Sequence, residues 1–143
     1  MNDQPWSHLI TLNSVVDMHR ESIARFGGDP FPEPVPGCVE SSLGAAWNAE
    51  LYAAKPGSVP GLCFAGCLLF YLIRNHCFVD GNKRAAWAAS MEVLRTLGLT
   101  VHASDHEAEE FCLDVITGRA SVHTGIDVCL WLAPRLLGLP DRR

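Results

Sequence analysis

The chain has 143 residues, a formal net charge of −5 and a hydrophobic fraction of 48%. This length fits a single domain, 1–143, that can bury a sizeable core, and the composition excludes an intrinsically disordered chain. Because no basic excess is present to neutralise the phosphates of duplex DNA, the charge disfavours a protein that binds DNA by itself.

The six cysteines and the apolar stretches predict a cytoplasmic protein with reduced thiols. No Cys-x-x-Cys pair is present, so zinc-ribbon and thioredoxin-like sites have no support. Five of the six cysteines lie in apolar surroundings, where a cysteine is usually a small buried hydrophobe. The longest apolar run, Leu62 to Ile73, is shorter than the roughly 20 residues that cross a bilayer, and the polar N-terminus carries no signal peptide.

The first predicted helix runs from Thr11 to Phe26. Thr11 can cap it, and apolar residues recur at three- and four-residue steps, as one buried face requires. The four prolines of residues 29–37 predict a loop. A shorter helix follows from Val39 to about Ala49, whereas residues 47–60 have no clear pattern.

Two further helices are expected to lie at the centre of the fold. Pro60 opens the third, which is apolar on nearly all sides and stops near Asn75. The fourth starts at Gly81 to Asn82 and ends at Gly98, and small side chains in its middle would let a neighbouring helix approach closely.

The last part of the chain also predicts helices. Ser104 and Glu107 form the pattern of a capping box, which opens a fifth helix that ends near Gly118. An amphipathic helix then runs from about Thr124 to Leu137. Because no convincing alternating strand is present, the predicted class is all-α.

The loop of residues 75–84, Asn-His-Cys-Phe-Val-Asp-Gly-Asn-Lys-Arg, differs from this packing pattern. The first turn of a helix carries unpaired N–H groups and a partial positive charge, so it favours anions. Lys83 and Arg84 oppose this dipole by about 0.3–1 kcal/mol each, a cost that a bound polyphosphate would offset. His76 can accept a proton from a hydroxyl, and Asp80 can cap the helix or hold Mg²⁺.

This loop resembles the motif of the Fic/Doc family, H-x-F-x-(D/E)-G-N-x-R. The matching positions are His76, Phe78, Asp80, Gly81, Asn82 and Arg84. Met18-His19 and residues 25–28, 40–43 and 94–99 resemble the Doc ("death on curing") branch, so the resemblance covers roughly residues 8–135. It implies a compact bundle of about six helices with the active-site loop between two central helices.

The resemblance also implies an activity and a set of roles. The protein would be the toxin of a toxin–antitoxin module, an ATP- and Mg²⁺-dependent phosphotransferase that modifies a hydroxyl of a translation elongation factor of the Tu type and so arrests growth. The implied catalytic residues are His76 as general base, Asp80 as magnesium ligand, Lys83 and Arg84. The implied nucleotide-binding residues are Gly81, Asn82, Lys83 and Arg84.

Three positions depart from the wider Fic pattern. Lys83 stands where Fic adenylyltransferases usually carry Gly, and Trp87 where they carry a second Arg. The Lys is typical of the Doc branch, where it implies that ATP lies reversed and that the γ-phosphoryl is transferred. AMP transfer and a catalytically silent binding module stay as alternatives, although no polar group of the motif is lost. Cys77 replaces a usual Pro and is interpreted as a tolerated loop change.

Other polar residues favour structural interpretations. His19 falls on the buried face of the first helix and is predicted to be a hydrogen-bonded core histidine. The remaining surface candidates, without an assigned partner, are His102, His106 and His123. Cys63 and Cys67 lie one helical turn apart and could join Cys77 and His76 in a metal site, but the apolar run favours packing.

Restraint of the activity is predicted to come from a second chain. Many Fic proteins carry an inhibitory helix with a pattern like (S/T)-x-x-x-E-(G/N), and no glutamate of this sequence is followed by Gly or Asn. The Doc branch implies an antitoxin whose disordered segment folds as a helix in a groove of the toxin. We expect this groove beside the fourth helix, and no membrane partner.

Overall fold

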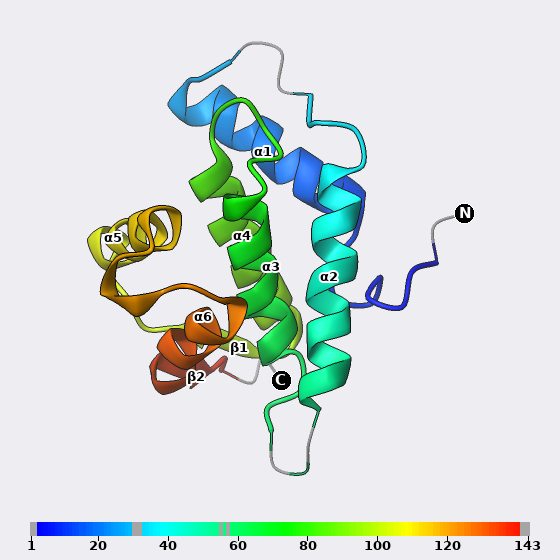
Figure 1. The fold of residues 1–143 in the computed structure, drawn as a ribbon, viewed down its shortest axis with the longest axis vertical. Coiled ribbons are helices and arrows are strands. Elements are labelled where there is room, and N and C mark those ends of the chain that lie inside the picture. Colours follow the sequence, from blue (N-terminus) through cyan, green and yellow to red (C-terminus); the bar gives the residue numbers. More distant parts are fainter. Residues whose placement is uncertain (1–2, 30–32, 55, 57, 141–143) are drawn as a thin grey trace.

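The computed structural model describes residues 3–29, 33–54, 56 and 58–140. Within this part the fold is all-α with one minute sheet, as the sequence predicts (Figure 1). The α-helices are α1 (Leu12–Phe26), α2 (Cys38–Ala53), α3 (Leu62–Arg74), α4 (Asn82–Thr96), α5 (Asp105–Thr117) and α6 (Gly125–Leu132). The remaining elements are β1 (Leu99–Val101), β2 (Leu136–Gly138) and the 3₁₀ turns η1 (Arg119–Ser121) and η2 (Ala133–Arg135).

The centre of the molecule is α3, which packs against α2, α4 and α6. It has no charged residue before Arg74, and large side chains such as Phe64, Leu68 and Leu72 are buried. Each such burial stabilises the fold by about 1.5–3 kcal/mol. In the described part of the chain, no helix is both long and apolar enough to cross a membrane. Because α3 is buried, the loop that follows it starts from the core of the domain.

The start of α3 differs from the sequence prediction in one detail. Its N-cap is Gly61, with a left-handed φ of +85°, and Pro60 precedes it. A glycine has no side chain to cap the helix. Instead, the Glu50 carboxylate of α2 accepts a hydrogen bond of 3.0 Å from the backbone N–H of Phe64 in the first turn of α3. The predicted end of α2 near Ala49 is therefore too early: the helix contains Glu50 and continues to Ala53.

The end of the chain is less helical than predicted. The last helix ends at Leu132 instead of Leu137, and Pro134 lies in the 3₁₀ turn that follows. The chain then forms β2, which pairs antiparallel with β1, with Leu99 opposite Gly138. Strands of three residues carry too little alternation to be recognised, and their pairing joins segments distant in the sequence.

Candidate active site

The loop between α3 and α4 holds His76 in an uncommon backbone conformation. Asn75 ends α3, and His76 follows with a φ of +53°, in the left-handed region that few non-glycine residues adopt. The His76 side chain is exposed, whereas Cys77 and Phe78 on its C-terminal side are buried. The imidazole is therefore displayed at the surface by a backbone that is fixed from below.

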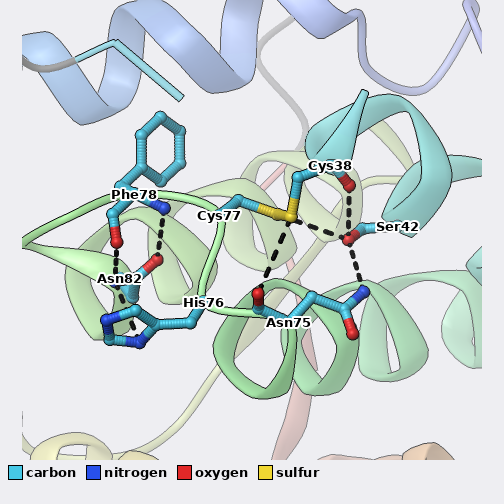
Figure 2. The surroundings of a disulfide bond; sticks show 7 residues. All are labelled: Cys38, Ser42, Asn75, His76, Cys77, Phe78 and Asn82. Atoms are coloured by element: carbon cyan, nitrogen blue, oxygen red, sulfur yellow. Dashed lines mark hydrogen bonds between the residues drawn. A yellow bond between two sulfur atoms is a disulfide. The ribbon is translucent and has the colours of Figure 1, made fainter. Parts of the chain in front are cut away.

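Asn82, the first residue of α4, fixes the loop from one side (Figure 2). Its Oδ1 accepts a hydrogen bond of 3.0 Å from the Phe78 N–H, and its Nδ2 donates one of 2.7 Å to the Phe78 carbonyl. The same Nδ2 lies 3.4 Å from Nδ1 of His76. Both ends of this buried amide are thus engaged within the loop, and its part in a phosphate clamp stays a prediction.

His19 of α1 fixes the loop from below. Its ring stacks on Phe78 with a centroid separation of 3.7 Å and an interplanar angle of 10°. Nε2 lies 2.6 Å from the carbonyl oxygen of Asp80, so the Nε2–H donates to it. The prediction of a hydrogen-bonded core histidine is confirmed, and the structure adds that this histidine carries the turn that precedes α4.

The first turn of α4 has no side-chain cap. Its N-cap is Gly81, with a left-handed φ of +76° that suits glycine. The prediction that Asp80 caps the helix is wrong, because the Asp80 carboxylate instead accepts from the N–H of Gly81 at 2.9 Å. Lys83 and Arg84 are exposed in this turn, which contains no acidic residue. The arrangement favours an anion at the start of α4.

A cleft of about 990 Å³ opens above this turn, between α1, the loop, α4 and α5. Its volume is that of a typical site for a small organic ligand. All the predicted site residues line it: His76, Asp80, Gly81, Asn82, Lys83 and Arg84. The cleft therefore brings together the residues that the loop pattern selects.

Two further cations, Arg25 of α1 and Arg74 of α3, line the same cleft. The Arg84 guanidinium lies 4.8 Å from the centroid of the Phe26 ring, and that of Arg25 lies 5.6 Å from it. Sequence analysis did not assign these two arginines to the site. The available signals were their places in the Arg-Phe-Gly-Gly stretch of residues 25–28 and directly before the loop.

The Asp80 carboxylate suits a hard cation in chemistry and position. It is exposed and lines the cleft. A Cβ added at Gly28 would lie 3.0 Å from Oδ2 of Asp80, so the glycine leaves room beside this carboxylate. Mg²⁺ is usually bound by one or two carboxylates together with substrate phosphates, and this donor set fits that pattern.

The prediction of reduced thiols is wrong for two of the six cysteines. Cys38, the first residue of α2, forms a disulfide with Cys77 of the loop, with a Cα–Cα distance of 5.3 Å (Figure 2). The two residues are 39 positions apart in the sequence, and only the packing of α2 beside the loop brings them together. Cys77 is therefore more than a tolerated change, because it covalently joins the loop to α2.

A cluster of three free thiols lies elsewhere, between α3 and α6. The sulfur atoms of Cys63, Cys67 and Cys129 lie within 4.8 Å of one another, and the predicted alternative partners Cys77 and His76 are not among them. Burial raises the pKa of Cys63 to about 12, and hydrogen bonding with Cys129 together with burial raises that of Cys67. Neutral thiols at this close helix contact act as small packing groups.

The other histidines lie outside the cleft. His102 and His123 are exposed, and His106 lies 3.8 Å from the Glu110 carboxylate one helical turn away. His76 lies in the segment before α4, six residues from its first residue, and His102 lies in the segment before α5, three residues from its first residue. It therefore offers a matched control for substitutions in the loop.

Comparison with known proteins relates this geometry to a family. The model of the Fic/DOC family matches residues 9–94, which contain α1, α2, α3, the loop and most of α4. A protein named Toxin Doc, from Mycolicibacterium smegmatis (strain ATCC 700084 / mc(2)155), is 45% identical over 56 residues. That alignment covers 37% of this chain and 42% of the relative, so it spans less than half of either protein.

Proposed function

Since this chain belongs to the Fic/Doc family, we propose that it is a Doc-type toxin that transfers the γ-phosphoryl group of ATP to a hydroxyl of a protein. The observation that carries the proposal is the start of α4. Its first turn has no side-chain cap, bears two exposed cations and faces a cleft shared with His76 and Asp80. The relative named Toxin Doc supports the toxin role.

In this proposal the start of α4 binds the phosphates. The free N–H groups of the first turn, the Lys83 ammonium and the Arg84 guanidinium donate to phosphate oxygens. A guanidinium can bind two oxygens of one phosphate, and an ammonium acts as a point charge. Phosphoryl transfer needs mainly positioning and stabilisation of charge on the equatorial oxygens, which fixed donors of this kind supply.

His76 is the general base of the proposed reaction. A neutral imidazole has one nitrogen with a free lone pair, which accepts the proton of the attacking hydroxyl. Asn82 and Phe78 hold the loop around His76, so the ring meets the substrate in a fixed place. Asp80 would hold Mg²⁺, which neutralises developing phosphate charge.

The choice of the γ-phosphoryl group rests on Lys83, which occupies the position of a glycine in the adenylyltransferase pattern. Incubation of the purified chain with a bacterial lysate and ATP labelled at either the α- or the γ-phosphate tests it. We expect the γ-label alone on one protein, and no label with His76→Ala. An α-label on the target would support AMP transfer instead, and no label in either arm would support a silent binding module.

The proposed target is a translation elongation factor of the Tu type, and the proposed restraint is an antitoxin. Phe26, Val79 and Ile116 are exposed apolar residues that line the cleft beside α4. They would contact the apolar face of an antitoxin helix, and the bound helix would block the access of the target to His76. Expression of this chain alone is expected to arrest growth, and co-expression of a neighbouring small gene to relieve the arrest. Harmless expression of an active chain would contradict this control.

A further inference from the structure

We propose that the Cys38–Cys77 disulfide positions His76, and that a dithiol which reduces this disulfide lowers the activity of the site. Cys38 and Cys77 are thus positioning residues, and their reduction is a switch. The inference rests on the proposed function in one respect, since it takes His76 to be the general base. The structural part, that the disulfide orders the His76 side chain, can be tested without any transfer reaction.

The position of His76 depends on both of its neighbours in the sequence. Its left-handed φ of +53° is unfavourable for a residue with a Cβ, so surrounding contacts must hold it. On the C-terminal side Phe78 is held by Asn82 and His19, as described above. The other supports of the loop come from α2 and the segment before it.

These supports converge on Cys77 and Asn75, which flank His76 (Figure 2). The Cys77 side chain is bonded to Cys38, and the backbone carbonyl of Cys77 accepts a hydrogen bond of 2.7 Å from the N–H of Val35. Nδ2 of Asn75 donates to Oγ of Ser42 at 3.0 Å, and that hydroxyl donates to the Cys38 carbonyl at 2.9 Å. The disulfide is the one covalent link in this set.

Opening the disulfide removes that link and leaves the hydrogen bonds. Cys38 is the first residue of α2 and follows Gly37, whose φ is +77°, so the helix start can move without a steric barrier at the glycine. The contacts of Phe78 with Asn82 and His19 persist, so the loop stays folded. We therefore expect a partial loss of activity, of about tenfold, from a less ordered His76.

The two sulfur atoms differ in access. Cys77 is completely buried, whereas Cys38 is partly exposed, so a reductant reaches Sγ of Cys38 first. A thiolate of the dithiol attacks Sγ of Cys38, the S–S bond breaks, and Cys77 leaves as a thiolate and takes a proton. The second thiol of the reductant then displaces Cys38, and the reductant ends as a disulfide, having supplied two electrons and two protons.

The first test counts thiols. Alkylation of the unfolded protein without reductant is expected to label four cysteines, namely Cys63, Cys67, Cys112 and Cys129, and alkylation after dithiothreitol all six. Six labelled cysteines without reductant, in protein purified under air, would overturn the proposal. Mass spectrometry reads both states directly.

The second test measures His76 in the full chain, oxidised or treated with dithiothreitol. We expect reduction to shift and broaden the His76 ring signals in NMR spectra, to lower kcat about tenfold and to leave the KM for ATP unchanged. Cys38→Ser is expected to behave like reduced protein under both conditions. Cys129→Ala, which removes a buried thiol of α6 outside the cleft, is expected to keep the full redox response.

The outcomes separate the two proposals. If reduced wild-type protein keeps the ring signals and the kcat of the oxidised protein, the disulfide does not position His76. If no variant transfers phosphate but the ring signals still respond to reduction, the proposed function fails and the positioning role stands. Should Cys38→Ser not fold, the comparison of oxidised and reduced wild-type protein decides alone.

Discussion

The first turns of α4 and α5 show two opposite ways to begin a helix. At α5 the Ser104 hydroxyl accepts from the Glu107 N–H at 3.1 Å, and the Glu107 carboxylate accepts from the Ser104 N–H at 3.2 Å. Asp105 and Glu107 also place negative charge near the positive end of the helix dipole. At α4 a left-handed Gly81 replaces the cap, and the charges are Lys83 and Arg84.

In the proposed function, the start of α4 serves binding at a cost in stability. A glycine in place of a capping Ser, Thr, Asp or Asn costs only about a few tenths of a kcal/mol, and each cation in the first turn costs about 0.3–1 kcal/mol. The middle of α4 offsets this cost, because Ala85, Ala86 and Ala89 are buried and Oγ of Ser90 donates to the Ala65 carbonyl at 2.8 Å. The core thus holds a helix whose first turn is available to a ligand.

The largest expected effect comes from removing the histidine in front of α4. His76→Ala is expected to lower phosphoryl transfer by about 10²–10⁴-fold, since a positioned base is lost. Helical content is expected to stay unchanged, because the ring is exposed. His102→Ala, in front of α5, is the matched control and keeps wild-type transfer. Equal activity of both variants in the γ-label assay would contradict the assigned base.

The second substitution changes the phosphate choice at α4. Lys83→Gly restores the residue of the adenylyltransferase pattern and removes one phosphate-binding cation. We expect phosphoryl transfer to fall by at least about tenfold and some α-label to appear on the target, since loss of one charge-assisted hydrogen bond costs about 1.5–3 kcal/mol. Arg95→Ala, a change to a cation in the last turn of α4, is the control. An unchanged γ-label with Lys83→Gly would contradict the role of Lys83.

A smaller effect is expected on the stability of the free protein, with opposite signs at the two helices. Lys83→Gln removes a cation that opposes the helix dipole, so the free energy of unfolding rises by about 0.3–1 kcal/mol at low salt. Glu107→Gln removes a favourable carboxylate and lowers the melting temperature. Thermal melts in low and high salt measure both. Destabilisation by Lys83→Gln would mean that this lysine serves the fold.

The smallest expected effect is a response to acid that α4 does not share. Hydrogen bonds from the Ser104 backbone and hydroxyl lower the pKa of Glu107. In the capping box of α6, the pKa of Asp127 is lowered mainly by a hydrogen bond from the His123 N–H. Each folded-state pKa lies below the unfolded value, so the stabilisation is present above the unfolded pKa and is lost as the pH falls through the folded pKa. Amide shifts between pH 6 and pH 2 are expected to show the first turns of α5 and α6 fraying. Equal fraying of the first turn of α4, as distinct from a local shift of the Gly81 N–H that bonds to the Asp80 carboxylate, would contradict this assignment.

Local patterns predicted the parts of the fold that depend on near neighbours in the sequence. The cap at Thr11, the capping box at Ser104 and the composition of the 75–84 loop fall in this class, and the structure confirms both caps. The Cys38–Cys77 disulfide, the Glu50 cap on α3 and the β1–β2 pairing join distant segments. No local pattern carries such pairings, because they arise only when helices pack.

The same limit applies to the candidate site. The six predicted site residues line the cleft together because they lie in the loop and in the first turn of α4, close to one another in the sequence. Arg25 and Arg74 reach the cleft from the ends of other helices, and His19 supports it from α1. Their contributions depend on the crossing of α1, α3 and α4, which a periodicity argument does not give.

The most direct test of the central claim, that the start of α4 is a phosphate site, is an NMR titration of the full chain with ATP and Mg²⁺. We expect saturable shifts of the backbone amides from Gly81 to Arg84, and none for those from Thr124 to Asp127, the capped first turn of α6, which lies outside the cleft. Binding that leaves the first turn of α4 unshifted, or that shifts both helix starts alike, would contradict the claim.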